Sequence, residues 1–445
     1  MTEVLIITAE GGSSVTVAAG IRNNNDIRNK GDGRYIHVIS FRIMLLLAWC
    51  RETLFPFARY IILRIPLINT AVDYVYPALM IIAAVGAFPY LVKKIRFTDL
   101  LIYMSMVTFV LLNAALFPSN SDYIFAAFGS TVSVMLLMFV GISIDYEENK
   151  KLLYFASLLG VVAQIIFTFI APSGSAVDEE RMNVAYVVLP SALYLIGYAL
   201  EKKKARYWFA ALLSFFMVLM CGTRGPAVIT VVFLFAGILT VTFSNLTPKK
   251  FILTAVFFAV LVVLLTTTDV LKTVAETLSG WFEDLGLSTR IFDRILEEDF
   301  NESKGRERIV QIIMSAVKEH PIFGNGLMGD RFILLVNRGT AGYSHNIFLE
   351  FWCEYGVILG TAFIAAVTVP PVIAFVKCRN VGIRLMILVL FCASVLKLSF
   401  SQSYVYDGDF YMFLGYTVAV LRYCREKSDL RRTEYCLPAA SASEP

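Results

Sequence analysis

Residues 357–376 read VILGTAFIAAVTVPPVIAFV, an apolar stretch without a charge, and Lys377, Cys378 and Arg379 follow it directly. A helix that crosses the hydrocarbon core of a membrane needs about 20 mostly apolar residues. The stretch has that length, and the basic residues behind it are typical of a cytoplasmic end. It therefore predicts a membrane-spanning helix, and much of the chain repeats the same pattern.

The composition agrees with a protein embedded in a bilayer. Of 445 residues, 58% are hydrophobic and 17% are charged, whereas soluble domains average about 45–50% and about 25%. The net charge of +4 is too small to indicate a nucleic-acid partner. Seven scattered cysteines without a CxxC pair and only three histidines argue against a metal site and a disulfide framework.

Further apolar segments of similar character are spread along the chain, and some of them are short. They are residues 75–92, 100–117, 123–144, 152–170, 184–200, 208–221, 226–243, 251–267, 385–400 and 410–421. Residues 41–67 form either one more span or an amphipathic surface helix, because charged residues interrupt them. The sequence therefore predicts an all-α polytopic membrane protein with 11–12 transmembrane helices.

The Lys/Arg bias of the connections predicts the orientation of these helices. Every second connection is basic, and the positive-inside rule places it in the cytoplasm. The alternate connections face outward, and the one at 269–345 is far longer than the others. The expected organisation is a disordered cytoplasmic tail (1–40), an N-terminal transmembrane bundle (41–268), a large helical extracytoplasmic loop (269–345), C-terminal transmembrane helices (346–424) and a cytoplasmic tail (425–445).

The outward loop holds a predicted amphipathic helix at 305–319, which Pro321 ends. At about 100° per residue, Arg306 projects toward the apolar stripe of that helix, whereas Arg308 lies on the polar flank. A charge directed at a buried face needs a partner. Arg306 therefore forms either an ion pair with an acid of the loop or a clamp for an anionic ligand.

Other candidate residues also lie on the outward side. Arg224 lies in a tight turn with glycines, where it either snorkels at the lipid surface or approaches a ligand closely. Arg181 precedes a membrane helix and either pairs with neighbouring glutamates or binds the same ligand. His345 lies at the outer membrane boundary beside Asn346 and about one helical turn from Glu350. It is either structural or a base with a tuned pKa.

Two aspartates at 407 and 409 suggest a metal site only weakly, because they lie in a short outward loop away from any nucleotide sugar. The chain has no GxxxxGK[ST], no GxGxxG after a strand and no HExxH. No metal and no cofactor are therefore expected. Three outward arginines with a histidine suit a lipid-linked diphosphate sugar, because guanidinium groups match phosphate oxygens.

Three blocks of the sequence resemble the O-antigen ligase and polysaccharide polymerase superfamily. They are GTRG at 222–225, KGR at 304–306 with HPIFGNG at 320–326, and SHNIFLE at 344–350 with YGVILG at 355–360. Thr223 stands where serine is commoner in the family, and Lys304 precedes the Gly-Arg pair. The resemblance covers residues 182–374 and extends to the rest by topology.

The resemblance implies a GT-C-type glycosyltransferase in the bacterial cytoplasmic (inner) membrane, with its active site on the extracytoplasmic side and without a metal. It would polymerise undecaprenyl-diphosphate-linked repeat units into O-antigen, capsule or exopolysaccharide. Arg224, Arg306 and, less closely matched, Arg181 would hold the donor diphosphate, and His345 with Arg306 would be catalytic, supported by Asn346 and Glu350.

The sequence leaves other functions open. One is a ligase that transfers the glycan to lipid A core or protein, and another is a flippase for lipid-linked oligosaccharides. The expected partners are the lipid-linked glycan donor, a glycan or lipid A core acceptor, the bilayer, and a chain-length regulator or flippase.

Overall fold

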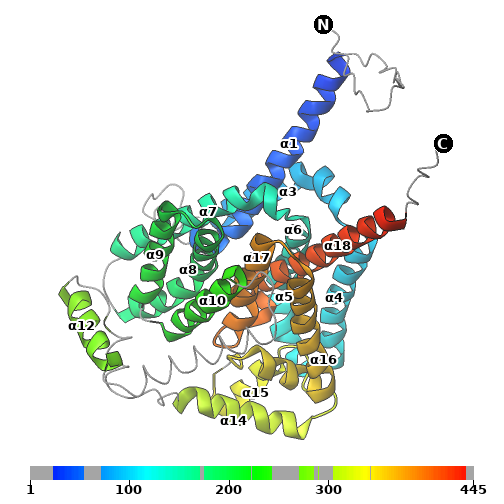
Figure 1. Cartoon of the computed structure of the whole chain (residues 1–445). Coiled ribbons are helices and arrows are strands. Elements are labelled where there is room, and N and C mark those ends of the chain that lie inside the picture. The colour runs from blue at the N-terminus through cyan, green and yellow to red at the C-terminus, as the bar shows by residue number, and fades with distance from the viewer. Residues whose placement is uncertain are drawn as a thin grey trace.

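The computed structural model describes residues 24–54, 72–170, 175–221, 223–242, 270–284, 289, 304–340 and 342–436. The described residues form helices and no strand (Figure 1). The helices are α1 (Asn24–Trp49), α3 (Val72–Lys94), α4 (Phe97–Leu116), η1 (Pro118–Asn120), α5 (Ser121–Met135), α6 (Leu137–Ser143), α7 (Tyr146–Ile170), α8 (Ser175–Lys202), α9 (Ala205–Met220), α10 (Arg224–Thr242), α12 (Val270–Asp284), α14 (Lys304–Glu319), α15 (Gly329–Arg338), α16 (Ile347–Lys377), α17 (Val381–Phe391), η2 (Cys392–Leu396), η3 (Tyr404–Tyr406) and α18 (Gly408–Cys436).

Seven helical stretches of the described chain are long and apolar enough to cross a membrane. They lie at 75–94, 97–116, 118–143, 146–167, 184–202, 225–242 and 347–377, and three shorter apolar helices lie at 35–49, 205–219 and 381–396. The predicted all-α polytopic membrane architecture is therefore confirmed. The span expected at 251–267 lies outside the described residues, so the count of 11–12 stays a prediction.

The centre of the bundle is α8, which packs against α7, α9, α10 and α17. Its span at 184–202 is largely buried inside the protein. On another side, α6 and α18 approach so closely that a Cβ on Gly141 or Gly415 would collide with the backbone of the facing helix. Small residues of this kind allow helix backbones to pack tightly where the lipid supplies no hydrophobic driving force.

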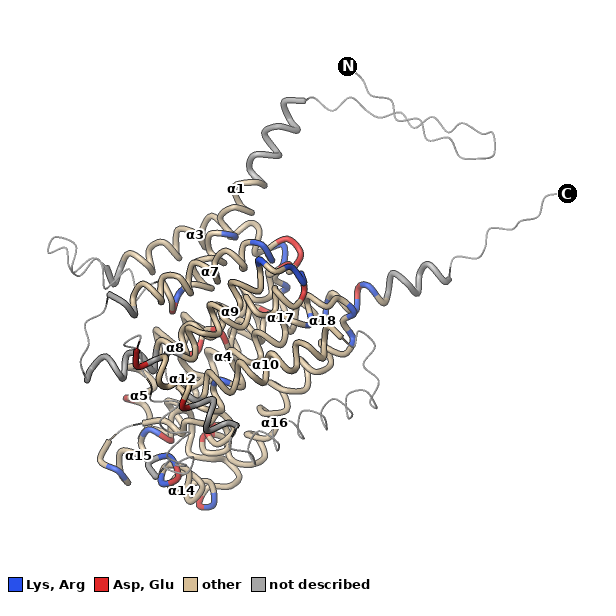
Figure 2. Tube along the Cα trace, turned by 60° about the vertical axis from the view of Figure 1, so that its left-hand side comes forward, with Lys and Arg blue, Asp and Glu red and all other residues tan. Residues whose placement is uncertain are grey.

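The charged residues separate toward two ends of the bundle. Figure 2 shows basic residues gathered near α17 and α18, while a second charged group lies on α14 and α15 at the far end of the molecule. This arrangement follows from the alternation of basic and non-basic connections along the chain. Within the predicted outward loop, α14 confirms the helix expected at 305–319.

The structure differs from the expectation near the N-terminus. The helix α1 begins at Asn24, so residues 24–40 belong to a helix where a disordered tail was expected. Residues 41–54 continue as α1 and one further turn, and they bury Phe41, Leu45 and Thr53. The polar character of the segment obscured a helix whose inner face packs against α3 and α7.

Candidate active site

A break in α16 fixes the frame of the site. Gly356 has φ 75° and ψ 175° inside α16, which interrupts the helical hydrogen bonds at that point. The turn at 320–326 replaces them: Asn325 N–H donates to Cys353 O at 2.8 Å, and Gly326 N–H donates to Glu354 O at 2.8 Å. In return, Val357 N–H donates to Pro321 O at 2.7 Å. The glycine-rich turn therefore docks the segment that precedes α16 onto the start of α16 and satisfies its freed backbone groups.

Substitution of Gly356 by alanine is expected to destabilise the protein by about 2–4 kcal/mol. The positive φ disfavours a side chain, and the new Cβ would collide with the carbonyl oxygen of Ile322. Gly129→Ala is the matched control, because Gly129 lies in helix α5 and a Cβ there would meet nothing within 4 Å. Thermal unfolding in detergent measures both variants, and an equal change in the two would contradict the docking role of Gly356.

A buried ion network lies beneath this turn. Arg331, in α15, has its Nη1 3.0 Å from Glu350 Oε1 and 3.6 Å from Glu354 Oε1, and it also pairs with Asp330. Its Nη2 donates to Ser403 Oγ at 2.6 Å. The three carboxylate side chains are 0% exposed. The network joins α15, α16 and the connection that precedes α18 into one unit.

These three carboxylates are also close enough together to bind a metal ion. Most of their oxygens already have partners, and Glu350 Oε2 is a buried oxygen without a hydrogen-bond partner among the described residues. Besides Arg331, Glu354 accepts from Met328 N–H at 2.7 Å and from the Tyr404 hydroxyl at 2.5 Å, and Asp330 accepts from Ser344 N–H at 2.9 Å. The Arg331 guanidinium contacts all three carboxylates and contributes one positive charge to the cluster. The cluster is therefore a structural salt-bridge network that holds the loop against α16.

The start of α16 positions His345. Asn346 caps the helix, because its side-chain oxygen accepts from Phe348 N–H at 2.9 Å and Leu349 N–H at 3.2 Å. Immediately before this cap, His345 has φ 54°, a left-handed conformation that is strained for a residue with a side chain. Its ring packs on Tyr343, with the ring centroids 4.1 Å apart. Strain of this kind is often retained at functional sites.

Half-burial and positive neighbours make His345 neutral at physiological pH. Burial is the largest cause, and the charges of Arg306 and Arg338 add to it, so that the pKa of His345 falls to about 4 although Asp330 acts in the opposite direction. Its Nδ1 is buried and has no hydrogen-bond partner in the part of the chain that the structure describes. A neutral imidazole with an unpartnered nitrogen is able to accept a proton.

Arg306 lies in the first turn of α14 and is exposed. It shares a helix side with Ile309 and Ile313, which are buried, but the expectation that Arg306 itself points at a buried face is wrong. The buried stripe packs on Leu334 and Cys353 and leaves the first turn of the helix uncovered. The exposed guanidinium lies within electrostatic range of His345 and Tyr186.

The other two expected arginines are placed only by their backbone. Arg224 is the first residue of α10, and a Cβ on the next residue, Gly225, would collide with the Tyr186 hydroxyl. Arg181 belongs to α8, which already begins at Ser175, so it lies within a helix where an outward connection was expected. The side chains of both arginines lie outside the described residues.

A cavity of about 390 Å³ adjoins these groups. Tyr343, which packs on His345, and Tyr186, which Gly225 approaches, both belong to its lining. Neither Arg306 nor His345 lines the cavity. Arg306 and His345 therefore lie outside the lining of this cavity. That Arg224, Arg306 and His345 border one common cavity stays a prediction.

The family comparison falls on this same part of the chain. Residues 209–364 match a family model described as O-Antigen ligase. Residues 209–364 therefore resemble an O-antigen ligase domain. No curated protein matches the chain. The predicted resemblance is therefore confirmed, and the protein is a multi-pass membrane enzyme of the O-antigen ligase and polymerase type.

The matched residues 209–364 include Arg224, Arg306 and His345. Lys397, Asp407 and Asp409, which line the cavity, lie after the matched residues. Lys397 follows the π-helical turn η2 and is buried, with its Nζ 2.7 Å from Asp407 Oδ2 and 3.0 Å from Asp409 Oδ2. A buried ammonium needs such partners. The two aspartates therefore have Lys397 as a structural partner.

The two expected supporting residues, Asn346 and Glu350, have different surroundings in the structure. Asn346 holds the backbone next to His345 through its helix cap. Glu350 is turned into the buried network with Arg331 and Ser403, and the described contacts do not connect it to His345. Three groups were missed from the sequence: Arg331, Arg338 and Tyr343. The sequence holds a signal for Arg331. Glu350 and Glu354 lie one turn apart in an apolar helix, and buried acids need a cation.

Proposed function

We propose that this protein polymerises undecaprenyl-diphosphate-linked repeat units into a surface polysaccharide. The observation that carries the proposal is the approach of an exposed, unpaired Arg306 to a neutral His345, with no ion pair to Arg306 among the described residues. An arginine without an acid partner is suited to an anionic ligand, and a neutral histidine is suited to take a proton.

Helix ends add to the attraction for a diphosphate. Arg224 begins α10, Arg306 lies in the first turn of α14, and His345 lies just before α16. The N-terminus of a helix carries unpaired N–H groups and a partial positive charge, which favour phosphate. Arg224 and Arg306, with the looser contribution of Arg181, would thus hold the donor diphosphate. Arg338, whose charge also reaches His345, is a further candidate.

The reaction proposed is a single glycosyl transfer. A hydroxyl of the acceptor glycan attacks the anomeric carbon of the donor, and a new C–O bond forms as the bond to the diphosphate oxygen breaks. His345 takes the proton of the hydroxyl, and the arginines neutralise the charge that develops on the leaving undecaprenyl diphosphate. Neither step draws on a metal or a nucleotide sugar.

A ligase is the second candidate, and the description of the matched family as O-Antigen ligase favours it. The donor and the chemistry would be the same, and only the acceptor would differ: lipid A core or a protein instead of a growing glycan. A strain without the gene distinguishes the two. Single repeat units without polymer support the polymerase, whereas full-length polymer that stays on undecaprenyl diphosphate supports the ligase. The family match names an enzyme and lends no support to the flippase alternative.

Purified protein should form glycosidic bonds from a lipid-linked oligosaccharide donor in detergent, and Arg306→Gln should lower that rate about 100-fold or more. Arg308→Gln is the matched control, because Arg308 is also exposed and lies two residues along the same helix. The products are resolved by gel electrophoresis and mass spectrometry. Equal rates for the two variants would exclude Arg306 from the diphosphate site, and a wild-type protein without transferase activity on any lipid-linked donor would contradict the proposed function.

A further inference from the structure

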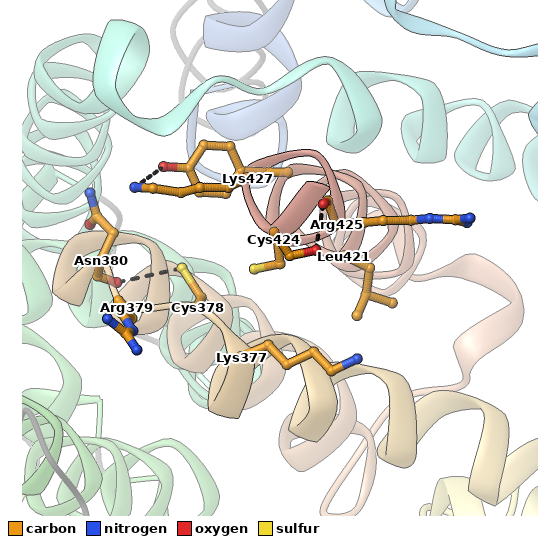
Figure 3. Close-up of a pocket in the computed structure, with 10 residues that line it drawn as sticks. Lys377, Cys378, Arg379, Asn380, Leu421, Cys424, Arg425 and Lys427 are labelled. Atoms are coloured by element: carbon orange, nitrogen blue, oxygen red, sulfur yellow. Dashed lines mark hydrogen bonds between the residues drawn. The ribbon is translucent and has the colours of Figure 1, made fainter. Parts of the chain in front are cut away.

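A second, larger cavity lies where α16 ends and α18 passes beside it. Its volume is about 750 Å³. Figure 3 shows residues 377–380 on one side and residues of α18 on the other. The lining consists of Lys377, Cys378, Arg379, Asn380, Leu421, Tyr423, Cys424, Arg425, Lys427 and Ser428. Its lining residues on α18 belong to the end of the bundle where basic residues gather near α17 and α18 (Figure 2).

The described charged residues that line this cavity are all basic. The cavity is lined by Lys377, Arg379, Arg425 and Lys427, and by no Asp or Glu of the described chain. None of the four forms an ion pair within the described ranges. Nearby basic residues behave differently: Arg422 pairs with Asp99, and Arg96 pairs with Glu426 at 3.1 Å. Arg96 and Arg422 are therefore paired with acids, while the four basic residues around the cavity have no ion pair in the described chain.

A fifth positive charge lies directly behind the cavity wall. Arg384 is 8% exposed, and it donates to the carbonyl oxygens of Cys378 and Val376. Its Nη1 is buried and unpartnered among the described residues, and no carboxylate pairs with it there. A buried guanidinium without a counter-ion is costly unless an anion lies nearby. The buried group is an observation independent of the four surface cations.

The approach to the cavity is apolar. On α16, Val369, Val372, Ile373 and Val376 are exposed, and Ile373 lies one turn before Lys377 on the same stripe of the helix. Leu421 contributes an apolar side chain to the lining itself. A ligand that carries a negative head beside apolar chains matches this arrangement, because the head meets the cations and the chains follow the exposed face of α16.

We infer that this cavity binds the phosphate headgroup of an anionic phospholipid, with the acyl chains along α16. Basic pockets between membrane helices on the cytoplasmic side favour such headgroups, and each basic residue near the surface strengthens the attraction about fivefold. Arginine adds paired hydrogen bonds to phosphate oxygens. The site is separate from the glycosyl-transfer residues, and it does not depend on the proposed function.

The test measures binding of phosphatidylglycerol and of phosphatidylcholine to the purified full-length protein by native mass spectrometry. Phosphatidylglycerol is expected to bind at least tenfold more tightly. The double variant Arg425→Gln/Lys427→Gln should lose about tenfold or more of that affinity. Lys203→Gln/Lys204→Gln removes the same charge from an exposed basic connection outside the cavity and should change it less than twofold.

Two outcomes of the lipid-binding measurement would overturn the inference. Equal losses in both double variants would mean diffuse attraction to a basic surface. Displacement of the lipid by inorganic phosphate at equal concentration would mean a site for a soluble anion. Alkylation of Cys424 gives a readout in the unmodified protein, because this thiol lines the cavity. Its modification, followed on the Cys424 peptide, should slow in phosphatidylglycerol bilayers compared with phosphatidylcholine bilayers, and equal rates would also overturn the inference.

Discussion

Replacement of His345 by glutamine is expected to lower the rate of glycan transfer by about 100-fold to 10,000-fold, the usual contribution of a general base. The folded protein should persist, because the half-buried ring has no hydrogen-bond partner at Nδ1 within the described chain. The measurement is the initial rate of product formation from a lipid-linked donor. The matched control is His320→Gln, since His320 is exposed and lies on the same loop. Equal rates for the wild type and both variants would remove His345 from the mechanism.

The pH profile gives a second readout of the same residue. Because the pKa of His345 is lowered from 6.5 to about 4, the free enzyme keeps the neutral base down to about that pH. The value of kcat/KM, which reports the free enzyme, should therefore show no His345 step near 6.5 and should fall only toward pH 4. A bound diphosphate stabilises the protonated ring, so the acid limb of kcat should lie at higher pH.

The same depressed pKa affects stability with a definite sign. The unfolded chain binds a proton at this histidine below about 6.5, whereas the folded protein does so only below about 4. The contribution to stability is therefore complete above pH 6.5 and is lost as the pH falls toward 4. His345→Gln should remove this part of the acid sensitivity. If kcat/KM of the wild type instead fell near pH 6.5, and if His345→Gln did not show this fall, the pKa of His345 would be unperturbed.

Replacement of Arg331 by methionine is expected to lower the free energy of unfolding by about 3–5 kcal/mol, because it leaves buried carboxylates without their cation. Asp330, Glu350 and Glu354 are 0% exposed around it. The measurement is thermal unfolding in detergent, together with the yield of monodisperse protein. Arg308→Met is the control, because its guanidinium is exposed, and it should change the stability by less than about 0.5 kcal/mol.

Arg331→Lys keeps the prediction testable if the methionine variant does not fold. A lysine retains the charge but cannot contact two carboxylates and Ser403 at once with a planar fork. It should give an intermediate loss of stability. Wild-type stability in both Arg331 variants would show that the network does not hold α15 and α16 together.

Helical periodicity carried most of the fold information, but it could not give the environment of each site residue. The amphipathic pattern at 305–319 predicted α14 within one residue of its observed start. It also turned Arg306 toward a covered face, and the structure exposes that residue because α14 overlies Leu334 and Cys353 only from Ile309 onward. Periodicity gives the side of a helix, whereas burial depends on where a neighbouring element ends.

Glu350 shows the same limit, because its place in the sequence did not predict its partners. Its position one turn from His345 suggested support for a base, yet its partners, Arg331 and Ser403, are 19 and 53 residues away in the chain. Sequence proximity placed the residue correctly on α16. It did not reveal which side of the helix faces the histidine and which faces the ion network.

By itself, the sequence determined the membrane-embedded helical class and the likeness of residues 209–364 to the O-antigen ligase family. These depend on local properties: the length of apolar runs and the order of short motifs. Only the tertiary structure decided that the glycine turn at 320–326 satisfies the backbone groups freed at Gly356, that Arg331 contacts three buried acids, and that Arg306 lies within electrostatic range of His345. Those pairings join residues far apart in the chain, and their energies depend on burial that no single segment specifies.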